Sequence, residues 1–282
     1  MKNQKITLGF SPCPNDTFIF DAMVHYKIDT EGLEFEVFMG DVEELNHKAF
    51  RSELDITKLS YHAFAHLISD YQLLNSGSAL GQNCGPLLIS KCSQLNDENS
   101  EIQVAIPGKY TTANFLFSLA YPEITNKVEL IFSDIEQAVI DGKVDAGLII
   151  HENRFTYQDK GLIKIKDLGE FWEEVYNAPI PLGGIVVKRS IESDLQQKID
   201  RVLKRSVQFA FENPESSSDY VSQNAQAMNS EVAKQHIKLY VNEYSVDLGK
   251  TGREAVEILV NKAVDLKIIP SITKDIFVEN RI

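Results

Sequence analysis

Residues 6–18 read ITLGFSPCPNDTF, and this stretch predicts a strand that runs through a rigid turn into a helix. Ile6–Phe10 is the apolar strand. Pro12 and Pro14 each fix φ at about −65° and remove a backbone donor, so the turn is stiff. A stiff turn with N–H groups at a helix start can hold an anionic or polar ligand, although an ordinary capped loop has the same residue types. The next three residues are types that cap helices: Asn15, Asp16 and Thr17.

Strands and helices alternate through the first half of the chain. Apolar runs predict strands at Ile6–Phe10, Glu34–Met39, Leu54–Leu59, Leu87–Ser90, Val104–Ile106, Leu130–Phe132 and Ala146–Ile150. Helices are predicted between them at Thr17–Tyr26, Asp41–Arg51, Thr112–Ala120 and Ser133–Asp141. This alternation predicts parallel sheets with covered faces. Helical periodicity in the last third predicts helices at Ile191–Phe211, Glu231–Tyr244 and Gly252–Leu266.

A faint duplication relates two parts of the chain. Residues 51–55 and 141–145 each end a predicted helix, turn at a small residue and enter a short strand after an aspartate. The first of these strands ends in Lys58 and Ser60, and the second ends in His151. Sheets of this kind bind ligands beyond the carboxyl ends of their strands. The duplication therefore predicts two similar lobes that present these ends to one ligand.

Two strands that begin at Gly85 and Gly183 are the expected crossovers between the lobes, although two ordinary strands after a glycine turn would have the same pattern. We predict an α/β protein with a two-lobed, periplasmic-binding-protein-like (type II) fold and a ligand cleft between the lobes. The first lobe is expected to be discontinuous, with residues 1–90 plus 185–282 and the C-terminal helices. The second is expected to span residues 91–184.

The composition argues against several classes of protein. The 282 residues carry a formal net charge of −13, whereas nucleic-acid binding needs a basic surface. No run approaches the ~20 apolar residues of a membrane span. The first residues lead into a strand without the apolar core of a signal peptide, and an odd count of three cysteines is typical of reduced thiols. A cytoplasmic protein is therefore expected.

Motifs that hold cofactors are missing from the sequence. It has neither a Gly-x-Gly-x-x-Gly stretch nor a Walker loop, and its histidines, cysteines and acidic residues do not fall at metal-ligand spacing. We therefore expect no cofactor and no metal. The expected partner is a small anionic substrate, and no obligate protein partner is inferred.

Polar side chains at predicted strand ends and helix starts are the candidates for chemistry. His151 follows an apolar strand, where an imidazole can act as a base near neutral pH. Thr111 and Thr112 precede a helix, where hydroxyl and N–H groups can bind a carboxylate or phosphate. Lys58 can supply the positive charge that an aromatic carboxylate needs. The structural alternatives are plain helix caps and a solvated lysine at a strand end.

Six motifs, taken in order, resemble those of a known enzyme family. They are SPCPNDTF at 11–18, KLSYH at 58–62, GQNCGP at 81–86, PGKYTTA at 107–113, DAGLIIHE at 145–152 and PLGG at 181–184. Together they closely resemble the 1,4-dihydroxy-6-naphthoate synthases, the MqnD enzymes of the MqnA/MqnD family, which act on the futalosine route to menaquinone. The resemblance runs from about residue 6 to about residue 190.

This resemblance implies a lyase that converts cyclic dehypoxanthinylfutalosine to 1,4-dihydroxy-6-naphthoate and dihydroxyacetone. The implied step is a retro-aldol-type C–C cleavage that requires no cofactor, and His151 matches the family's general base. The residues expected to bind the substrate are Lys58, Leu59, Ser60, Thr111 and Thr112 from the resemblance, with Asn15 and Asp16 from the rigid turn.

Two other functions are compatible with the same architecture. Chorismate dehydratase belongs to the same pathway and has the same fold, but the Ser11–Asp16 turn and the His151 segment argue against it. A non-enzymatic solute-binding protein is the third possibility. The missing signal peptide and the histidine at a strand end argue against that one.

Overall fold

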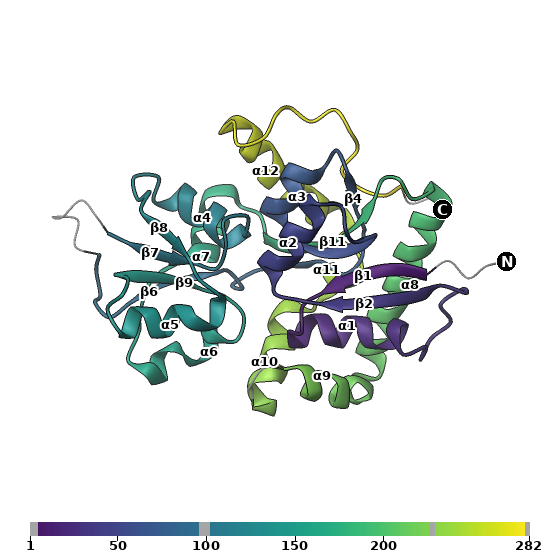
Figure 1. Cartoon of the computed structure of the whole chain (residues 1–282), viewed down its shortest axis with the longest axis horizontal. Coiled ribbons are helices and arrows are strands. Elements are labelled where there is room, and N and C mark those ends of the chain that lie inside the picture. The colour runs from purple at the N-terminus through teal and green to yellow at the C-terminus, as the bar shows by residue number, and fades with distance from the viewer. Residues whose placement is uncertain (1–4, 96–101, 226–228, 280–282) are drawn as a thin grey trace. The chain divides into compact units, whose positions relative to one another are not determined.

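The computed structural model describes residues 5–95, 102–225 and 229–279, and in it the chain divides into two compact units (Figure 1). Unit 1 contains Met1–Gly81 and Pro181–Ile282, and unit 2 contains Gln82–Ile180. Each unit has its own sheet. The chain is therefore α/β, as predicted, with one α/β layer structure in each unit.

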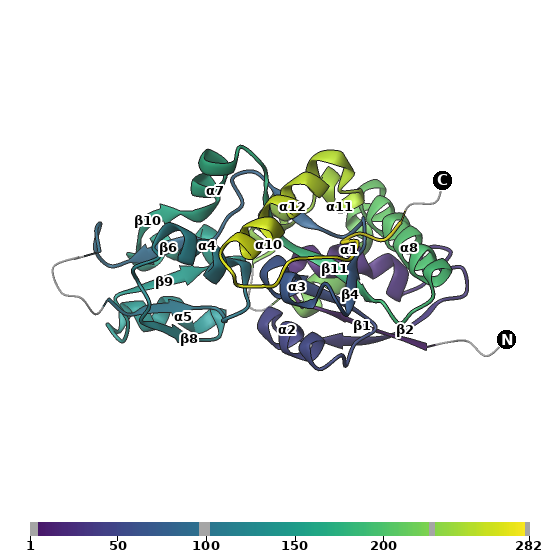
Figure 2. The same ribbon diagram turned by 90° about the horizontal axis from the view of Figure 1, so that it is seen from above.

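The sheet of unit 1 has the strand order β2-β1-β3-β11-β4, and β5 also pairs with β11. Figure 2 labels β1, β2, β4 and β11 of this sheet. Its strands are β1 (Lys5–Phe10), β2 (Glu34–Met39), β3 (Ile56–Ser60), β4 (Tyr71–Leu73), β5 (Ala79–Gly81) and β11 (Ile180–Lys188). β1 is parallel to β2 and to β3, whereas β11 is antiparallel to β3 and β4. The carboxyl ends of β1, β2 and β3 consequently lie at one edge of the sheet.

Helices cover both faces of this sheet, as parallel strands require (Figure 1). One face carries α1 (Pro14–Val24), which packs against α8 (Ser193–Glu212), α9 (Ser218–Asn224) and α10 (Ser230–Tyr240). The other carries α2 (Val42–Phe50), α3 (Tyr61–Leu67) and α12 (Gly249–Asp265). The short helices of unit 1 are the 3-10 helix Pro214–Ser217 and α11 (Glu243–Val246).

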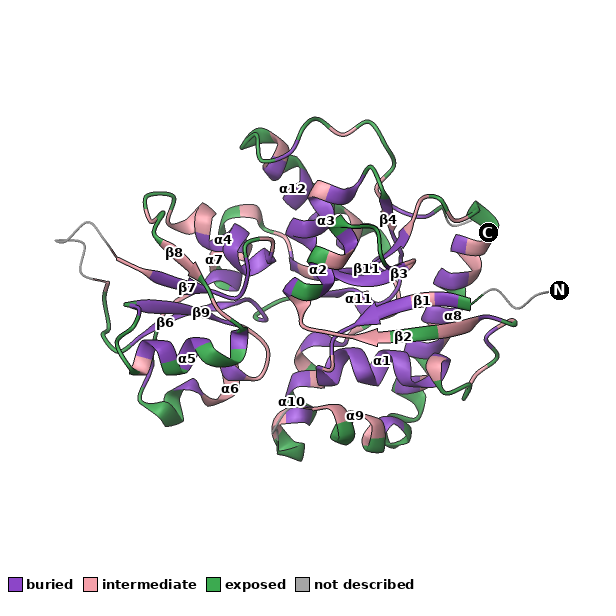
Figure 3. Cartoon of the chain, viewed as in Figure 1, coloured by how far each residue is buried: buried purple, intermediate pink, exposed green. Residues whose placement is uncertain are grey.

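The core of unit 1 is the layer between its sheet and α1. Phe10 of β1 stacks on Phe20 of α1 with ring centroids 4.5 Å apart, and Leu203 of α8 closes the same cluster. Figure 3 shows β1 largely buried, whereas β2 at the edge is partly exposed. Burial of this continuous apolar layer is the main force that holds α1 and the turn before it in place.

The sheet of unit 2 has the order β10-β6-β9-β7-β8. Its strands are β6 (Leu87–Ser90), β7 (Val104–Ile106), β8 (Lys127–Glu129), β9 (Ala146–Ile149) and β10 (Ile163–Asp167). One face is covered by α5 (Phe132–Ile140) and α6 (Asn153–Thr156), and the other by α4 (Thr112–Ala120) and α7 (Leu168–Tyr176) (Figure 1). A 3-10 helix follows α6 at Tyr157–Lys160.

The predicted duplication is confirmed by the two sheets. β1, α1, β2, α2 and β3 of unit 1 correspond in order and direction to β7, α4, β8, α5 and β9 of unit 2. Asp55 accepts a hydrogen bond from the Thr7 backbone N–H at 3.1 Å, and Asp145 accepts one from the Gln103 N–H at 2.8 Å. Each aspartate before a strand thus ties it to the strand beside it, rather than only capping a turn.

The Asp55 carboxylate accepts two further hydrogen bonds. The Thr7 hydroxyl donates to it at 2.9 Å and Lys188 Nζ at 3.1 Å. Burial raises the pKa of Asp55, but these donors outweigh it and lower the pKa overall.

Close packing accounts for the glycines of the two predicted crossover strands, because a side chain at either position would collide with a neighbouring backbone. A Cβ on Gly183 would lie 2.8 Å from the Leu59 carbonyl oxygen, and one on Gly85 would lie 2.2 Å from the Gly169 nitrogen. Both glycines therefore let backbone segments of the same unit approach each other.

Three sequence predictions need correction. The strand expected at 130–132 is wrong, because β8 ends at Glu129 and Phe132 already begins α5. The first helix begins at Pro14, since a proline at the first helical position loses no hydrogen bond. The predicted boundary at residue 90 would separate β6 from β9 and β10, with which it pairs, and the predicted boundary at residue 184 would cut through β11. The division between the units instead falls after Gly81 and after Ile180. In addition, the sequence analysis missed the strands β4, β5 and β10 and the helices α3, α6, α7 and α9.

Among the helices of residues 5–95, 102–225 and 229–279, none is both long enough and apolar enough to cross a membrane.

Burial predicts which cysteine reacts. Cys84 is 1% exposed, and burial raises the pKa of its thiol to about 12, although the nearby Arg154 partly offsets this. Cys92 is exposed. Because only the thiolate is nucleophilic, we expect iodoacetamide at pH 8 to label Cys92 and to leave Cys84 unlabelled until a denaturant is added. Peptide mass spectrometry measures both sites, and equal labelling rates in the native protein would contradict the buried position of Cys84.

Candidate functional site

Two clusters of side chains, mostly polar, lie at the carboxyl ends of parallel strands, one in each unit. The elbow cluster of unit 1 consists of Ser11, Asn15, Asp16, Lys58 and Ser60. The edge cluster of unit 2 consists of Thr111, Thr112, Phe132 and His151. In each unit, one part of the cluster follows the first strand of the duplicated motif and another part lies at the end of the third strand. These are the positions at which sheets of this kind bind ligands.

Asp16 is the centre of the elbow cluster. Its Oδ2 accepts hydrogen bonds from the Ser11 hydroxyl at 2.8 Å and the Ser11 backbone N–H at 3.1 Å. Its Oδ1 accepts from Asn15 Nδ2 at 2.8 Å and from Lys58 Nζ at 3.0 Å. Asp16 is 1% exposed, and four protein donors already surround its carboxylate. Asp16 therefore organises its neighbours and has little capacity left for a ligand.

The sequence predicted Asn15, Asp16 and Thr17 as helix caps, and this is wrong. All three lie inside the first turn of α1, and Cys13 occupies the capping position. The Asp16 side chain turns back to Ser11 instead of bonding a helix N–H, while the Thr17 hydroxyl donates to the Cys13 carbonyl at 3.1 Å. The rigid turn is consequently closed on itself by its own side chains.

Lys58 is buried, so it is not the solvated lysine that was one alternative. It is 7% exposed, and its ion pair with Asp16 joins the end of β3 to the start of α1. Gly183 on the neighbouring β11 makes room for it, because a Cβ there would lie 3.2 Å from Lys58 Cε. The positive charge of Lys58 is therefore balanced by Asp16.

Ser60 is positioned by a residue that the sequence analysis missed. Asn46 on α2 is fully buried, and its Oδ1 accepts from the Ser60 backbone N–H at 3.1 Å. Asn46 Nδ2 contacts the Ser60 hydroxyl at 3.4 Å and donates to Glu43 at 2.8 Å. An asparagine on the apolar side of a predicted helix was the available signal. Leu59 is 0% exposed, so its side chain belongs to the core.

Thr111 and Thr112 begin α4 in the edge cluster. Thr111 is the N-cap: its Oγ1 accepts from the Asn114 N–H at 3.3 Å and donates to the Gly108 carbonyl at 2.7 Å. Gly108 has φ 152°, which a residue with a Cβ rarely adopts. The first turn of α4 contains no acidic residue. Its N–H groups and dipole therefore favour an anion.

His151 stands two residues beyond the end of β9 in a left-handed backbone conformation, with φ 57°. Its half-buried ring packs edge-on against Phe132, with centroids 4.9 Å apart. The next residue, Glu152, has one enclosed carboxylate oxygen with no hydrogen-bond partner among the described residues. Six other non-glycine residues of the described chain also have a positive φ, so the position of His151 beyond the end of a parallel strand, rather than its φ, favours a chemical role.

The structure thus places the predicted site residues in two groups. Asn15, Asp16 and Lys58 contact one another in unit 1, where Ser60 ends the same strand as Lys58. Thr111, Thr112 and His151 share one sheet edge in unit 2. Besides Asn46, the sequence analysis did not single out Ser11, which binds Asp16, or Phe132, which packs against His151. Groups of three or more metal-binding side chains do not occur in the part of the chain that the structure describes.

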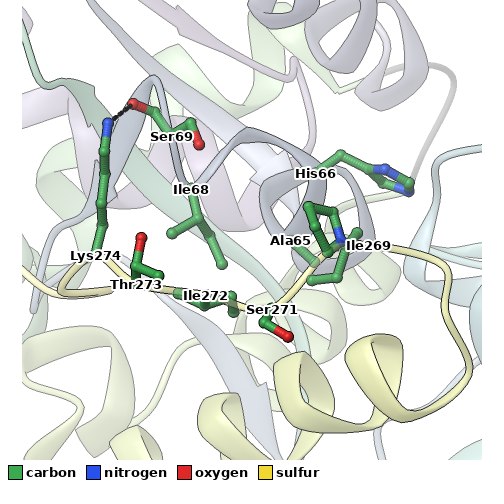
Figure 4. A pocket seen from close by; sticks show the side chains of 10 residues that line it. Ala65, His66, Ile68, Ser69, Ile269, Ser271, Ile272, Thr273 and Lys274 are labelled. Atoms are coloured by element: carbon green, nitrogen blue, oxygen red, sulfur yellow. Dashed lines mark hydrogen bonds between the residues drawn. The ribbon is translucent and has the colours of Figure 1, made fainter.

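A small pocket of about 70 Å³ lies elsewhere in unit 1, between the end of α3 and residues 269–274 (Figure 4). Lys274 Nζ donates to the Ser69 carbonyl beside it at 2.9 Å. The pocket contains no residue of the elbow cluster, and we assign it no function.

Comparison with known proteins identifies relatives along nearly the whole chain. A family model described as menaquinone biosynthesis matches residues 6–265. A protein of Streptomyces coelicolor named 1,4-dihydroxy-6-naphtoate synthase is 39% identical over 98% of this chain and 98% of its own. One of Thermus thermophilus with the same name is 43% identical over 92% of this chain and 94% of its own.

Solved structures agree with the predicted fold. A crystal structure of a protein from Archaeoglobus fulgidus has a TM-score of 0.88 at 36% identity, covering 95% of this chain and 100% of that one. The periplasmic aliphatic sulphonate binding protein SsuA from Escherichia coli has a TM-score of 0.64 at 10% identity, covering 98% and 94%. The periplasmic-binding-protein-like fold class is thereby confirmed.

The buried ion pair makes a prediction about stability. Asp16→Leu leaves the Lys58 ammonium buried without its partner, so we expect a loss of about 3–5 kcal/mol in the free energy of unfolding. The double variant Asp16→Leu/Lys58→Met removes both charges and should recover much of that loss. Urea denaturation measures both. Glu254→Leu, at an exposed ion pair with Lys250, is the control and should change little. A double variant as unstable as Asp16→Leu would contradict this account.

Proposed function

Because the chain belongs to the menaquinone biosynthesis family, we propose that it catalyses the 1,4-dihydroxy-6-naphthoate synthase reaction. In this reaction cyclic dehypoxanthinylfutalosine is cleaved to 1,4-dihydroxy-6-naphthoate and dihydroxyacetone. The observation that carries the proposal is the 39–43% identity, over nearly the full length, to two proteins that bear this enzyme's name. The position of His151 at the end of β9 supports it.

We assign the role of general base to His151. In a retro-aldol cleavage the base takes a hydroxyl proton, and the O–H electron pair forms a carbonyl. The C–C bond then breaks, and its electron pair passes into the ring system, which becomes aromatic. The imidazolium returns the proton to the product, so the reaction needs no oxidant or reductant. General base catalysis of this type contributes about 10²–10⁴-fold to a rate.

The substrate carboxylate is assigned to Thr111 and Thr112. The first turn of α4 offers N–H groups and the positive end of the helix dipole, and it contains no acidic residue, although Glu129 accepts from the Lys109 N–H in the turn before it. The chain's formal net charge of −13 makes such a local anion site necessary. In unit 1, we assign hydrogen bonds to substrate oxygen atoms to Lys58 and Ser60, and Asp16 positions Lys58.

The state of the cysteines indicates the compartment in which the reaction takes place. Cys13, Cys84 and Cys92 form no disulfide in the described part of the chain, which is typical of proteins in a reducing compartment. We accordingly place the reaction in the cytoplasm.

Turnover by the purified protein tests the reaction. The protein is incubated separately with cyclic dehypoxanthinylfutalosine and with chorismate, and the products are identified by mass spectrometry. We expect naphthoate and dihydroxyacetone from the first and no dehydration of the second. Conversion of chorismate would make the protein a dehydratase, and binding without turnover would make it a solute-binding protein.

Removal of the base should affect turnover far more than binding. We expect His151→Asn to lower kcat by about 10²–10⁴-fold with a much smaller change in KM, because proton transfer is felt in the transition state. Asparagine tolerates the left-handed backbone of residue 151, so the fold is kept. His25→Ala, at an exposed histidine outside both clusters, is the control. Near wild-type turnover by His151→Asn would disprove this mechanism.

A further inference from the structure

Asn15 contains a buried acceptor that the protein leaves unused. The residue is 7% exposed, and its Oδ1 is enclosed without a hydrogen-bond partner among the residues that the structure describes. Leaving a buried polar atom unpaired costs about 1–3 kcal/mol. Such an atom at the carboxyl end of β1 points to a hydrogen bond that is completed by a ligand.

The orientation of this amide follows from its neighbour. Asn15 Nδ2 donates to Asp16 Oδ1 at 2.8 Å. A carboxylate only accepts hydrogen bonds, so the NH₂ group must face Asp16 and the carbonyl oxygen must face away. Asp16 itself is fixed by Ser11 and Lys58. Asn15 Oδ1 is therefore held as an acceptor in a set direction.

Lys58 adds a donor to the same cluster. Lys58 Nζ and Asn15 Nδ2 both bind the same oxygen, Asp16 Oδ1, at 3.0 Å and 2.8 Å. An ammonium group has three N–H donors, and the bond to Asp16 uses one of them. The elbow cluster thus contains a donor and an acceptor that share Asp16 as their neighbour, with the positive charge already balanced.

A donor next to an acceptor fits a hydroxyl group, which both accepts and donates, and not a carboxylate. A bound carboxylate would place its charge against Asn15 Oδ1 and near Asp16, and neither attracts an anion. This argues against the sequence-based expectation that Lys58 balances the charge of an aromatic carboxylate. The first turn of α4, which has no acidic residue, is the better place for that group.

We propose that Asn15 is a specificity-determining residue: its Oδ1 accepts a hydrogen bond from a hydroxyl in the three-carbon part of the substrate, while Lys58 donates to the neighbouring oxygen. The inference rests on the proposed function. The three-carbon part leaves as dihydroxyacetone, so it carries oxygen atoms on adjacent carbons. Adjacent oxygens of this kind match an acceptor placed beside a donor. A site built for a hydroxyl strongly rejects a molecule that lacks it.

The test compares Asn15→Leu with the wild type in the turnover assay. We expect KM to rise about 10-fold or more, as the loss of one buried hydrogen bond predicts. Inhibition by 1,4-dihydroxy-6-naphthoate, which lacks the three-carbon part, should stay unchanged. Thr111→Ala should have the converse effect and weaken inhibition by the naphthoate.

Asn242→Leu is the matched control for loss of stability. Asn242 also lies in unit 1, and its amide is bonded within the protein, to the Leu80 carbonyl and the Tyr244 N–H at 2.9 Å each. This variant should lose thermal stability without a change in KM. If Asn15→Leu does not fold, Asn15→Ser removes the same acceptor with a smaller side chain.

An unchanged KM in a folded Asn15 variant would overturn the inference, and so would weaker inhibition by the naphthoate, because the hydroxyl would then belong to the ring part. These results leave the proposed function intact. A wild-type protein that does not cleave the substrate would instead overturn the proposed function and the inference together.

Discussion

The buried ion pair between Asp16 and Lys58 is the interaction on which the elbow cluster depends. It joins the start of α1 to the end of β3, and the same carboxylate fixes Ser11 and Asn15. Buried ion pairs are poor sources of net stability, because the desolvation of two charges offsets their attraction. The ion pair instead fixes the positions of the groups around it. It holds donors and one acceptor in set directions at the edge of the sheet, and the apolar core supplies the stability.

The two units use one topology for different chemistry. Asp55 and Asp145 tie equivalent pairs of strands together, so the strand ends beyond them are equally well defined in both units. What differs is the residue that follows each third strand: Ser60 ends β3 and is held by Asn46, whereas His151 follows β9 in a left-handed conformation. The two units therefore share a framework and differ in the residues at their strand ends.

Much of the fold could be predicted from the sequence, because alternating apolar runs and helix signals are local. Val104–Ile106 and Thr112–Ala120 occur as expected, and Asp41 caps α2 as its residue type suggests. The sequence indicated which residues belong to the candidate site, but not which of their side chains contact each other. The sequence gives no sign that Lys58 is buried against Asp16, since that pair spans 42 positions and depends on parallel pairing of β1 with β3. Likewise, helix-cap residue types could not reveal that Asp16 turns back to Ser11.

The start of the helix that follows the first strand differs in charge between the two units. In unit 1 the first turn of α1 contains an anion, Asp16, which accepts from the Ser11 N–H and pairs with the Lys58 ammonium. In unit 2 the first turn of α4 contains no acidic residue, and the Glu129 carboxylate instead accepts from the Lys109 N–H in the preceding turn. Equivalent positions of one topology therefore differ in local charge, and the start of α4 favours an anion more than the start of α1, where the protein already supplies one.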